Sequence, residues 1–454
     1  MPGTMTPKPT LATLANDLAS GRSTSRSLVE ACLEKILDPN GEGRTTFLHV
    51  DRQAALAQAD AMDLLRSSGA APTPFAGIPV SIKDLFDVAG QVTRAGSKLL
   101  ANRPAATQDA ASVARLRRAG FVLIGRTNMS EFAFSGLGLN PHYGTPRNPW
   151  ERAQGRIPGG SSSGAAISVA DGMAHVGIGT DTGGSCRIPA AFTGLVGYKP
   201  TARRVPQSGA IPLSTTLDST GPIARSVACC AAVDALLANE APPELTDCSP
   251  SGLRFAIPKT FVLENMDADV SAHFARSLSL ISAAGAHVEE IDIPEFARIP
   301  AINAKGGFSA AESYAWHRGL IASGAAEYDP RVLTRIERGA TQNAADYIDM
   351  LAARTALIAA VEKRIARFDA LLIPTTPIIA PRIAALASDD EFFKANALAL
   401  RNPAVINLLD GCAISIPNHE EGAPPTGLML ACRGGLDGQV FRCAAAVERV
   451  VRPG

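Results

Sequence analysis

The sequence predicts an α/β fold in which one large sheet is covered by helices on both faces. Short apolar runs alternate with amphipathic segments through most of the chain, which is typical of strands that alternate with helices. A segment of helical periodicity at 269–284 lies between apolar runs at 253–258 and 287–293, as in a strand–helix–strand unit. The 454 residues are 46% hydrophobic, which is sufficient for a large buried core.

The first part of the chain is predicted to form an outer layer of two or three helices. Apolar residues recur there at helical spacing, from Leu11 to about Leu65. Side-chain oxygens that precede such a segment can accept hydrogen bonds from the first backbone N–H groups of a helix. The candidate caps of this kind are Ser23, Ser25 and Asp51.

The later elements follow from the same two periodicities. In chain order they are a strand at 77–83, a helix at 109–119, a strand at 121–125, a helix-to-loop passage at 127–140, a helix at 162–171, a strand at 174–179, a helix at 347–367, strands at 370–374, 413–417 and 427–431, and a closing helix that starts at Asp437.

One Pro-rich stretch, at 241–251, is the candidate linker of the chain. The α/β pattern continues on both sides of it, so we interpret it as a surface loop and expect one domain over 11–454. Residues 1–10 contain no apolar signal core. We expect them to form a disordered lead-in.

Charge and composition argue against several classes of partner. The chain carries 43 Lys and Arg against 43 Asp and Glu, and its basic clusters are too short to follow a phosphate backbone. Nucleic acid is therefore not an expected partner. No run of 18 apolar residues is present, so no membrane partner is expected. A homodimer is the commonest oligomer among proteins, and no residue pattern here marks an interface.

The cysteines and histidines do not have metal-ligand spacing. The eight cysteines include no Cys-x-x-Cys pair, and no two of the seven histidines share a helix face at i, i+4. We therefore expect no metal site. Cysteines at this frequency in a chain without a signal segment are typical of reduced, mostly buried thiols in a cytoplasmic protein.

Two glycine–serine turns carry the chemistry of this sequence. Pro-Gly-Gly-Ser-Ser-Ser-Gly at 158–164 and Gly-Thr-Asp-Thr-Gly-Gly-Ser at 179–185 flank a segment long enough for one helix and one strand, so two serines can meet in space. Glycine also lets the main chain approach a reacting atom closely. The N–H groups that could converge beside the Ser185 hydroxyl are those of Thr182, Gly183, Gly184 and Ser185. This pattern favours acyl transfer through a serine, and a glycine-rich turn without chemistry is the alternative.

Lys83, at the end of an apolar run, is the candidate base. Of the histidines, only His142 and His175 lie near these motifs, and His175 falls in an apolar strand that is typical of a core position. A lysine titrates near 10.4, and lowering its pKa by about three units costs about 4 kcal/mol, which burial in a dry pocket can supply. The alternative is a surface strand end at which Lys83 pairs with Asp84 or Asp87.

Together these motifs resemble those of the amidase signature family, and the likeness runs from about residue 10 to 450. The resemblance implies a mixed sheet, a hydrolase of small-molecule amides that needs no cofactor, and related ester, anilide and carbamate chemistry. The matching segments are Gly77-Ile-Pro-Val-Ser-Ile-Lys-Asp, Gly125-Arg-Thr-Asn-Met-Ser-Glu-Phe-Ala, Gly159-Gly-Ser-Ser-Ser-Gly, the 24-residue step from Ser161 to Ser185, Gly179-Thr-Asp-Thr-Gly-Gly-Ser-Cys-Arg-Ile-Pro-Ala, Phe368-Asp-Ala-Leu-Leu-Ile-Pro-Thr-Thr-Pro and Pro424-Pro-Thr-Gly-Leu-Met-Leu.

The resemblance also implies a role for each residue of the two turns. Ser185 would be the nucleophile, Ser161 would relay its proton after a cis peptide bond, and Lys83 would accept that proton. Ser162 would orient this network by hydrogen bonds. The residues implied to form the oxyanion hole with Ser185 are Thr182, Gly183 and Gly184. The implied supporting pair is Asp181 and Arg187, for which an ordinary loop ion pair is the alternative. Cys186 is interpreted as a packing residue.

Two other catalytic readings remain open on the sequence. The first turn also fits Gly-x-Ser-x-Gly, with Ser162 as nucleophile and His419 as a late histidine, although the preceding 149–158 segment is mostly polar and does not resemble a strand. The A subunit of glutamyl-tRNA amidotransferase shares the signature and releases ammonia from glutamine within a complex. Arg354 resembles its glutamine-carboxylate ligand, and Asp437 lies near another ligand position. A surface helix arginine is the alternative for Arg354.

A non-catalytic protein on the same fold would be expected to lack one of the three catalytic residues, and this chain keeps all of them.

The walls of a substrate pocket are expected from the 127–140 passage, the 303–320 region and the loop after Thr375. Each candidate wall residue could equally be plain core. These candidates are Met129, Phe134, Tyr143, Tyr314 and Trp316.

Overall fold

The computed structural model describes residues 9–452. Residues 1–8 of the expected lead-in therefore lie outside the described residues. Thr10 caps the first helix, because its side chain accepts a hydrogen bond from the Thr13 N–H.

The described strands form one eleven-stranded mixed sheet, which confirms the predicted α/β class. The strand order is β1-β3-β2-β4-β6-β5-β10-β11-β9-β7-β8. The strands are β1 (Phe47–His49), β2 (Pro79–Lys83), β3 (Val122–Thr127), β4 (Val176–Thr180), β5 (Val196–Lys199), β6 (Thr220–Ala224), β7 (Arg254–Pro258), β8 (His287–Ile291), β9 (Ala370–Pro374), β10 (Cys412–Pro417) and β11 (Gly427–Cys432).

Helices surround this sheet, with short 3-10 turns between some of them. The helices are α1 (Leu11–Ala19), α2 (Ser25–Leu37), α3 (Gly43–Thr46), α4 (Arg52–Ser67), α5 (Ala111–Arg118), α6 (Ser163–Ala170), α7 (Arg187–Thr193), α8 (Val227–Ala238), α9 (Ala268–Ala283), α10 (Ile299–Ile302), α11 (Gly307–Gly324), α12 (Pro330–Glu337), α13 (Ala344–Ile365), α14 (Asp389–Leu408) and α15 (Asp437–Val451). The 3-10 helices are η1 (Glu131–Ala133), η2 (Arg152–Gln154), η3 (Pro294–Arg298), η4 (Ala325–Glu327), η5 (Arg338–Thr341) and η6 (Ile383–Leu386).

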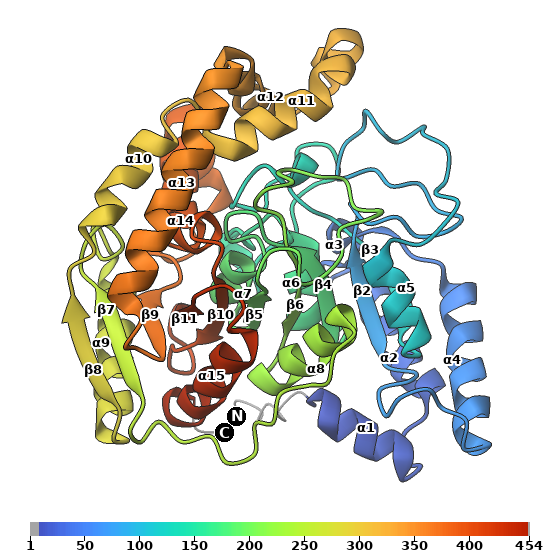
Figure 1. Ribbon diagram of the computed structural model, residues 1–454. Coiled ribbons are helices and arrows are strands. Elements are labelled where there is room, and N and C mark those ends of the chain that lie inside the picture. Colours follow the sequence, from blue (N-terminus) through green and yellow to red (C-terminus); the bar gives the residue numbers. More distant parts are fainter. Residues whose placement is uncertain (1–8, 453–454) are drawn as a thin grey trace.

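The sheet is buried on both faces, as its apolar strands predict. Helices α5, α8 and α15 cover one face, and α6, α7, α13 and α14 cover the other (Figure 1). Side chains along a strand alternate between the two faces. Leu372 of β9 accordingly belongs to the core under α8 and α15, whereas Leu371 and Ile373 belong to the core under α13 and α14. The helices α11 and α12 lie together at the top of Figure 1, and α13 packs against α11.

Most predicted elements are present within a few residues of their expected bounds, including the parallel β7–α9–β8 unit. The cap prediction is confirmed for Asp51 of α4. It is wrong for Ser23 and Ser25, because Thr24 caps α2 through its side chain. The stretch at 241–251 is irregular, as expected.

Several elements were not predicted, and their sequences explain why. Strands β5 and β6 are short and contain glycine or proline, residues that are depleted in strands. Helix α14 carries Pro403 in its interior, which is typical of a helix break rather than of a continuous helix. Helix α11 lacks a clear amphipathic pattern, and only a pocket contribution was expected from its region.

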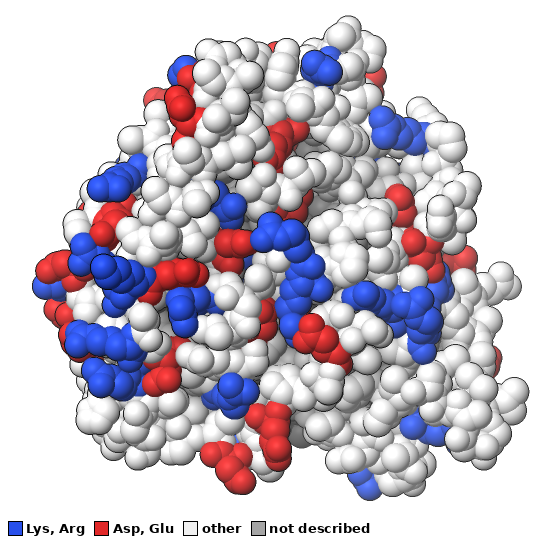
Figure 2. All heavy atoms as spheres, in the orientation of Figure 1, with Lys and Arg blue, Asp and Glu red and all other residues white. Residues whose placement is uncertain are grey.

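Charged side chains of both signs are interspersed on the face shown in Figure 2, in keeping with the zero net charge of the chain. Within residues 9–452, none of the helices combines the length and the apolar character that a bilayer crossing requires.

The fold places the two glycine–serine turns at one edge of the sheet. β2 and β4 are parallel neighbours, so their carboxyl ends, Lys83 and Thr180, lie at the same edge. The first turn leads into α6 and the second into α7, and both helices pack beneath the sheet at this edge. The 24-residue step from Ser161 to Ser185 therefore returns the chain to its starting point by one helix and one strand.

Candidate active site

Lys83 lies at the carboxyl end of β2, and its side chain is fully buried. Its Nζ donates hydrogen bonds to Ser161 Oγ at 2.7 Å and to Thr180 Oγ1 at 2.8 Å. The alternative of a surface pair with an adjacent carboxylate is wrong. Asp84 is itself buried and binds Arg126 Nε through Oδ1 at 2.9 Å. The ammonium group of Lys83 is thus directed at two hydroxyl groups.

The surroundings of Lys83 make its neutral form more accessible than in an exposed lysine. Burial lowers the pKa of Lys83 to about 8, against smaller opposing effects of Cys186, Asp218 and Asp181. The cause is the one expected from the apolar sequence context, because a charged ammonium loses its hydration in a dry site. At neutral pH, about a tenth of such lysines are uncharged, compared with less than about a thousandth at the ordinary pKa.

Ser161 follows a cis peptide bond from Gly160, as the resemblance implies. Its side chain is fully buried, and its carbonyl oxygen accepts a hydrogen bond from the Ser130 N–H at 3.1 Å. The neighbouring Gly160 has no room for a side chain, since a Cβ there would lie 2.6 Å from the backbone nitrogen of Gly138.

Ser162 and Ser185 connect the two turns. The Ser162 N–H donates to the Ser185 carbonyl at 3.3 Å, and Ser162 Oγ donates to the Thr180 carbonyl at 3.3 Å. Ser185 is 3% exposed and lines a cavity. Within the described residues, no hydrogen bond joins Ser185 Oγ to Ser161 Oγ. Such contacts are often long before a substrate is bound.

The residues predicted as oxyanion donors divide into two groups. Thr182, Gly183 and Ser185 line the cavity, and the structure shows no intramolecular acceptor for their N–H groups within the residues it describes. The Gly184 N–H instead donates to Asp181 Oδ1 at 2.9 Å. Gly184 thus supports the turn through its backbone, and its φ of +125° suits glycine.

Asp181 and Arg187 form a fully buried ion pair, with Nη2 and Oδ1 at 2.8 Å. Burial raises the pKa of Asp181, but the Arg187 guanidinium, together with Lys199 and Asn407, holds that pKa well below its usual range. The carboxylate also accepts from the Cys186 N–H at 3.1 Å, and Asn407 Nδ2 donates to it at 3.0 Å. The pair therefore fixes the turn that carries Ser185, which an ordinary exposed loop ion pair would not do.

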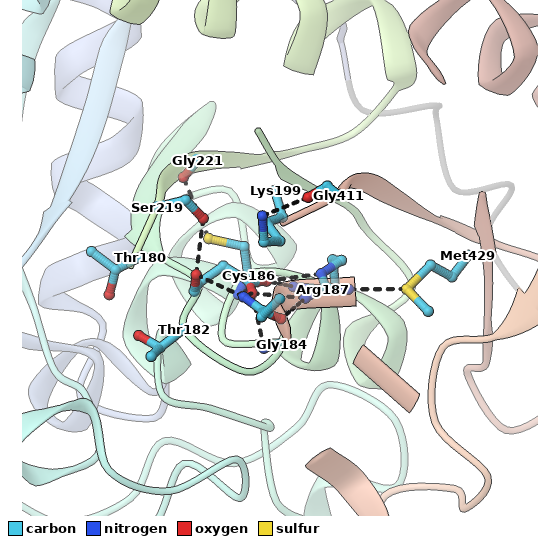
Figure 3. A network of polar contacts seen from close by, with 12 residues as sticks. Thr180, Thr182, Gly184, Cys186, Arg187, Lys199, Ser219, Gly221, Gly411 and Met429 are labelled. Carbon is cyan, nitrogen blue, oxygen red and sulfur yellow. Dashed lines mark hydrogen bonds and ion pairs between the residues drawn. The ribbon is translucent and has the colours of Figure 1, made fainter. Parts of the chain in front are cut away.

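Figure 3 shows this network from close by. Arg187 points from α7 toward Met429 of β11, and its Nη1 donates to the Met429 sulfur at 3.1 Å. Burial raises the pKa of the Cys186 thiol to about 12, which agrees with its interpretation as a packing residue. Lys199 lies nearby in Figure 3 and donates to the Gly411 carbonyl at 2.7 Å.

The cavity beside Ser185 has a volume of about 190 Å³. Two of the three segments expected to supply its walls do so, namely the 127–140 passage and the start of α11 with the loop before it. The lining residues are Ala133, Phe134, Ser135, Thr182, Gly183, Ser185, Leu213, Leu217, Asn303, Gly306, Phe308, Ser309, Arg335, Leu400, Ala404 and Leu408.

Of the predicted wall residues, Phe134 lines the cavity and the others do not. Met129 is fully buried in the core, and the Tyr143 hydroxyl donates to the Ser97 carbonyl at 3.2 Å. Tyr314 and Trp316 lie further along α11 and pack against the core, whereas only the first turn of α11 reaches the cavity.

The loop after Thr375 does not line the cavity either. The Thr375 hydroxyl is buried and forms a 2.7 Å hydrogen bond with that of Ser415. The residues that follow bind Asp267 instead. The Asp267 N–H donates to the Pro377 carbonyl, and the Ile379 N–H donates to Asp267 Oδ2.

The two positions suggested by the likeness to the amidotransferase lie outside the cavity. Arg354 donates from Nε to the Leu408 carbonyl at 2.9 Å, and its Nη2 lies 3.7 Å from Asp410 Oδ1, so it supports the wall from behind. Asp437 accepts from the Tyr198 hydroxyl at 2.6 Å and from Thr201, at the start of α15. Neither residue lines the cavity beside Ser185, because α13 carries Arg354 behind the wall and α15 carries Asp437 on the other face of the sheet.

The arrangement with Ser162 as nucleophile and His419 as base is not supported. No strand leads into Ser162, which instead directly precedes α6. His419 lies beside Gly194, at the end of α7 opposite to Ser185. Burial lowers the pKa of His419 to about 4. His175, expected in the core, contacts the guanidinium of Arg225 at 3.4 Å.

Sequence reasoning missed three polar residues of the site. Thr180 binds Lys83 and could have been found, because it ends the strand that precedes the second turn. Asp218 accepts from the Thr182 hydroxyl and from the N–H groups of Leu213 and Ser214, and burial raises its pKa to about 6. Arg335 lines the cavity from α12. The sequence around these last two contains no signal that points to the site.

Over residues 9–452, no group of three or more His, Cys, Asp or Glu side chains is arranged to hold a metal ion. The eight cysteines are all present as free thiols.

Comparisons with known proteins identify the family of this chain. Residues 27–441 match the family model described as Amidase. The chain is 33% identical to 2-amino-5-chloromuconic acid deaminase of Comamonas testosteroni, over 98% of this chain and 96% of that protein. It is 32% identical to the A subunit of glutamyl-tRNA(Gln) amidotransferase of Streptomyces coelicolor, over 97% of this chain and 95% of that subunit. A crystal structure of an amidase, 32% identical, has a TM-score of 0.87 over 97% of this chain and 99% of that one. The chain therefore belongs to the amidase signature family and is a hydrolase of C–N bonds.

Proposed function

We propose that this protein hydrolyses a small-molecule amide through an acyl-enzyme on Ser185. The observation that carries the proposal is the 2.7 Å hydrogen bond between Lys83 Nζ and Ser161 Oγ, buried beneath the turn that presents Ser185 to a cavity. A lysine with its pKa lowered to about 8 can serve as a base near neutral pH.

The reaction follows from this arrangement. Neutral Lys83 takes the proton of Ser161, which takes that of Ser185 as its oxygen attacks the amide carbonyl. The N–H groups of Thr182, Gly183 and Ser185 stabilise the oxyanion, and one such donor typically contributes about 2.7–4 kcal/mol to the barrier. Protonated Lys83 then returns the proton through Ser161 to the leaving nitrogen. Water repeats the sequence on the acyl-enzyme and releases the acid.

Esters, anilides and carbamates pass through the same tetrahedral chemistry and belong in the same set of substrates to be tested. A second candidate function is the release of ammonia from glutamine within an amidotransferase complex, which the 32% identity to the A subunit of such an enzyme favours. The position of Arg354 outside the cavity speaks against it. The relative named as a deaminase adds an amino-acid substrate, 2-amino-5-chloromuconic acid, to the compounds worth testing.

The test is hydrolysis by the purified chain of primary amides, aryl amides, esters and carbamates, with glutamine and 2-amino-5-chloromuconic acid alongside. We expect turnover that Ser185→Ala reduces below about one part in a thousand, while circular dichroism shows an intact fold. Higher residual activity would count against Ser185 as the nucleophile. No turnover by a folded protein, followed by glutaminase activity once partner subunits are added, would favour the amidotransferase instead.

A further inference from the structure

The wall of the cavity beside Ser185 combines apolar and polar residues and contains one charged side chain. Leu213, Leu217, Phe308, Leu400 and Leu408 supply the apolar surface. Of the lining residues, only Arg335 carries a charge, and none is an aspartate or a glutamate. A guanidinium in such a wall is costly to bury unless an anion accompanies it.

Arg335 has no carboxylate partner within the described part of the chain. Its Nη1 donates to the Phe134 carbonyl, and its guanidinium lies 4.3 Å from the centre of the Phe134 ring. Burial lowers the pKa of Arg335 to about 10, and the neighbouring charge of Arg338 contributes in the same direction. One carbonyl oxygen occupies one of the five N–H groups that an arginine can donate.

Two other arginines near this region behave differently. Arg331, one turn earlier on α12, also stacks on an aromatic ring, that of Phe392 at 4.5 Å, but it forms an ion pair with Asp389 at 2.8 Å. Arg354, behind the wall, has Asp410 at 3.7 Å. Among these three arginines, the one that lines the cavity is the one without a protein anion.

We propose that Arg335 binds a carboxylate of the substrate, so that the enzyme acts on small amides that carry a free carboxylate group. This inference rests on the proposed function, because it names the substrate class of the same site. The planar guanidinium fork matches the two oxygens of a carboxylate. The leucines and Phe308 then contact a short apolar segment between the carboxylate and the scissile amide. A volume of about 190 Å³ limits that segment, since pockets for drug-sized ligands span about 300–1,000 Å³.

The test compares matched substrates that differ in this one group. Glutaramate is paired with glutaramide, and N-butyrylglycine with N-butyrylethanolamine, so that the carboxylate lies on the acyl side in one pair and on the amine side in the other. We expect the wild-type enzyme to have a kcat/KM at least about tenfold higher for the carboxylate member of one pair. Arg335→Met should lower that value about 10- to 100-fold and leave the neutral member within about threefold.

Two further variants separate binding from folding. Arg331→Met removes another arginine of α12, which stacks on the Phe392 ring of α14 outside the cavity, and should leave the substrate preference unchanged. Arg335→Lys keeps the charge without the fork, and should retain part of the preference. Equal losses for both members of a pair in Arg335→Met would identify a structural role and overturn the inference.

The outcomes also distinguish this inference from the proposed function. Turnover that depends on Ser185 but shows no preference for either carboxylate member would overturn the inference alone. If no amide is hydrolysed, titration calorimetry with glutarate tests whether Arg335 binds a carboxylate. Binding to the wild type that Arg335→Met abolishes, and Arg331→Met does not, would support a carboxylate site. Absence of binding to the wild type would overturn it.

Discussion

Two buried lysines show that burial alone does not identify a base. Burial lowers the pKa of both Lys83 and Lys199 to about 8. Lys199 donates to the backbone carbonyls of Pro200 and Gly411, which cannot yield a proton to it. Lys83 donates to the hydroxyls of Ser161 and Thr180, and a hydroxyl can do so. The hydrogen-bond partners, more than the pKa, are what support Lys83 rather than Lys199 as the proposed base.

The activity should therefore follow the neutral form of Lys83. Because its pKa is lowered to about 8, the uncharged fraction rises about tenfold per pH unit below that value and levels off above it. We expect kcat/KM to increase from pH 6 to about pH 8 and then reach a plateau. The measurement is a pH–rate profile on a neutral amide. A flat profile across this range would contradict Lys83 as the base.

Substituting each lysine in turn separates the two roles. Lys83→Met should lower kcat about 100- to 10,000-fold, the range for loss of a general base, while the protein stays folded. Lys199→Met leaves two buried carbonyls without a donor, so it should lower the free energy of unfolding by about 1–3 kcal/mol and keep kcat within a few fold. The measurements are initial rates and urea titrations. A reversed pattern would assign the base to Lys199.

At the scale of elements, the turn before α7 is held by the charged side chains of Asp181 and Arg187 rather than by the turn preferences of its own residues. Asp181 binds the N–H groups of Gly184 and Cys186 and the guanidinium of Arg187, so one carboxylate sets both the turn and the start of the helix. Asn407, from α14, completes this contact. Helix α7 consequently begins beside Ser185, and the pair that the resemblance marked as supporting holds the turn between β4 and α7.

Breaking this ion pair should destabilise the fold strongly. Asp181→Asn leaves the buried Arg187 without a counter-charge, which typically costs about 3–5 kcal/mol, and Arg187→Met leaves Asp181 in the same position. The double variant should lose less than the sum of the two, because it strands neither charge. Urea titrations of the four proteins measure this coupling. Arg364→Met, which removes a partly exposed ion pair with Glu295, is the control and should cost no more than about 1 kcal/mol. Strictly additive losses would contradict the coupling.

At the scale of the whole molecule, the sheet joins distant parts of the chain. β5 pairs with β10, more than 200 residues later in the sequence, and α15 packs against α8. Parts from both ends of the chain therefore share one core. We propose on this basis that residues 11–454 form one domain and that the irregular stretch at 241–251 is a loop within it.

A cut in that loop should not separate the chain. We expect a protease site inserted after Pro243 to be cleaved readily, because the loop is largely exposed, and the two fragments to elute together from a size-exclusion column. The sheet pairing between β5 and β10 would hold them. Uncut protein with the same insertion is the control. Fragments that elute separately without denaturant would indicate two domains.

The sequence by itself determined the α/β class, most strands, the two glycine–serine turns and the positions of Lys83, Ser161 and Ser185. These features follow from neighbouring residues, because the step between the turns is one helix and one strand, whose geometry is regular. The hydrogen bond from the Gly184 N–H to Asp181 could not be predicted, because it depends on atomic contacts that the spacing of residues in the sequence does not reveal.

Only the tertiary structure decided which residues surround the cavity. Phe134, a predicted wall residue, lines the cavity, but Arg335 and Leu217 come from segments far away in the sequence. Arg354 lies behind the wall, where it contacts Leu408 and Asp410. A wall residue is selected by how separate elements pack, and packing depends on every element between them. Local pattern therefore marks the residues that we propose to react, while the shape and charge of the cavity required the whole fold.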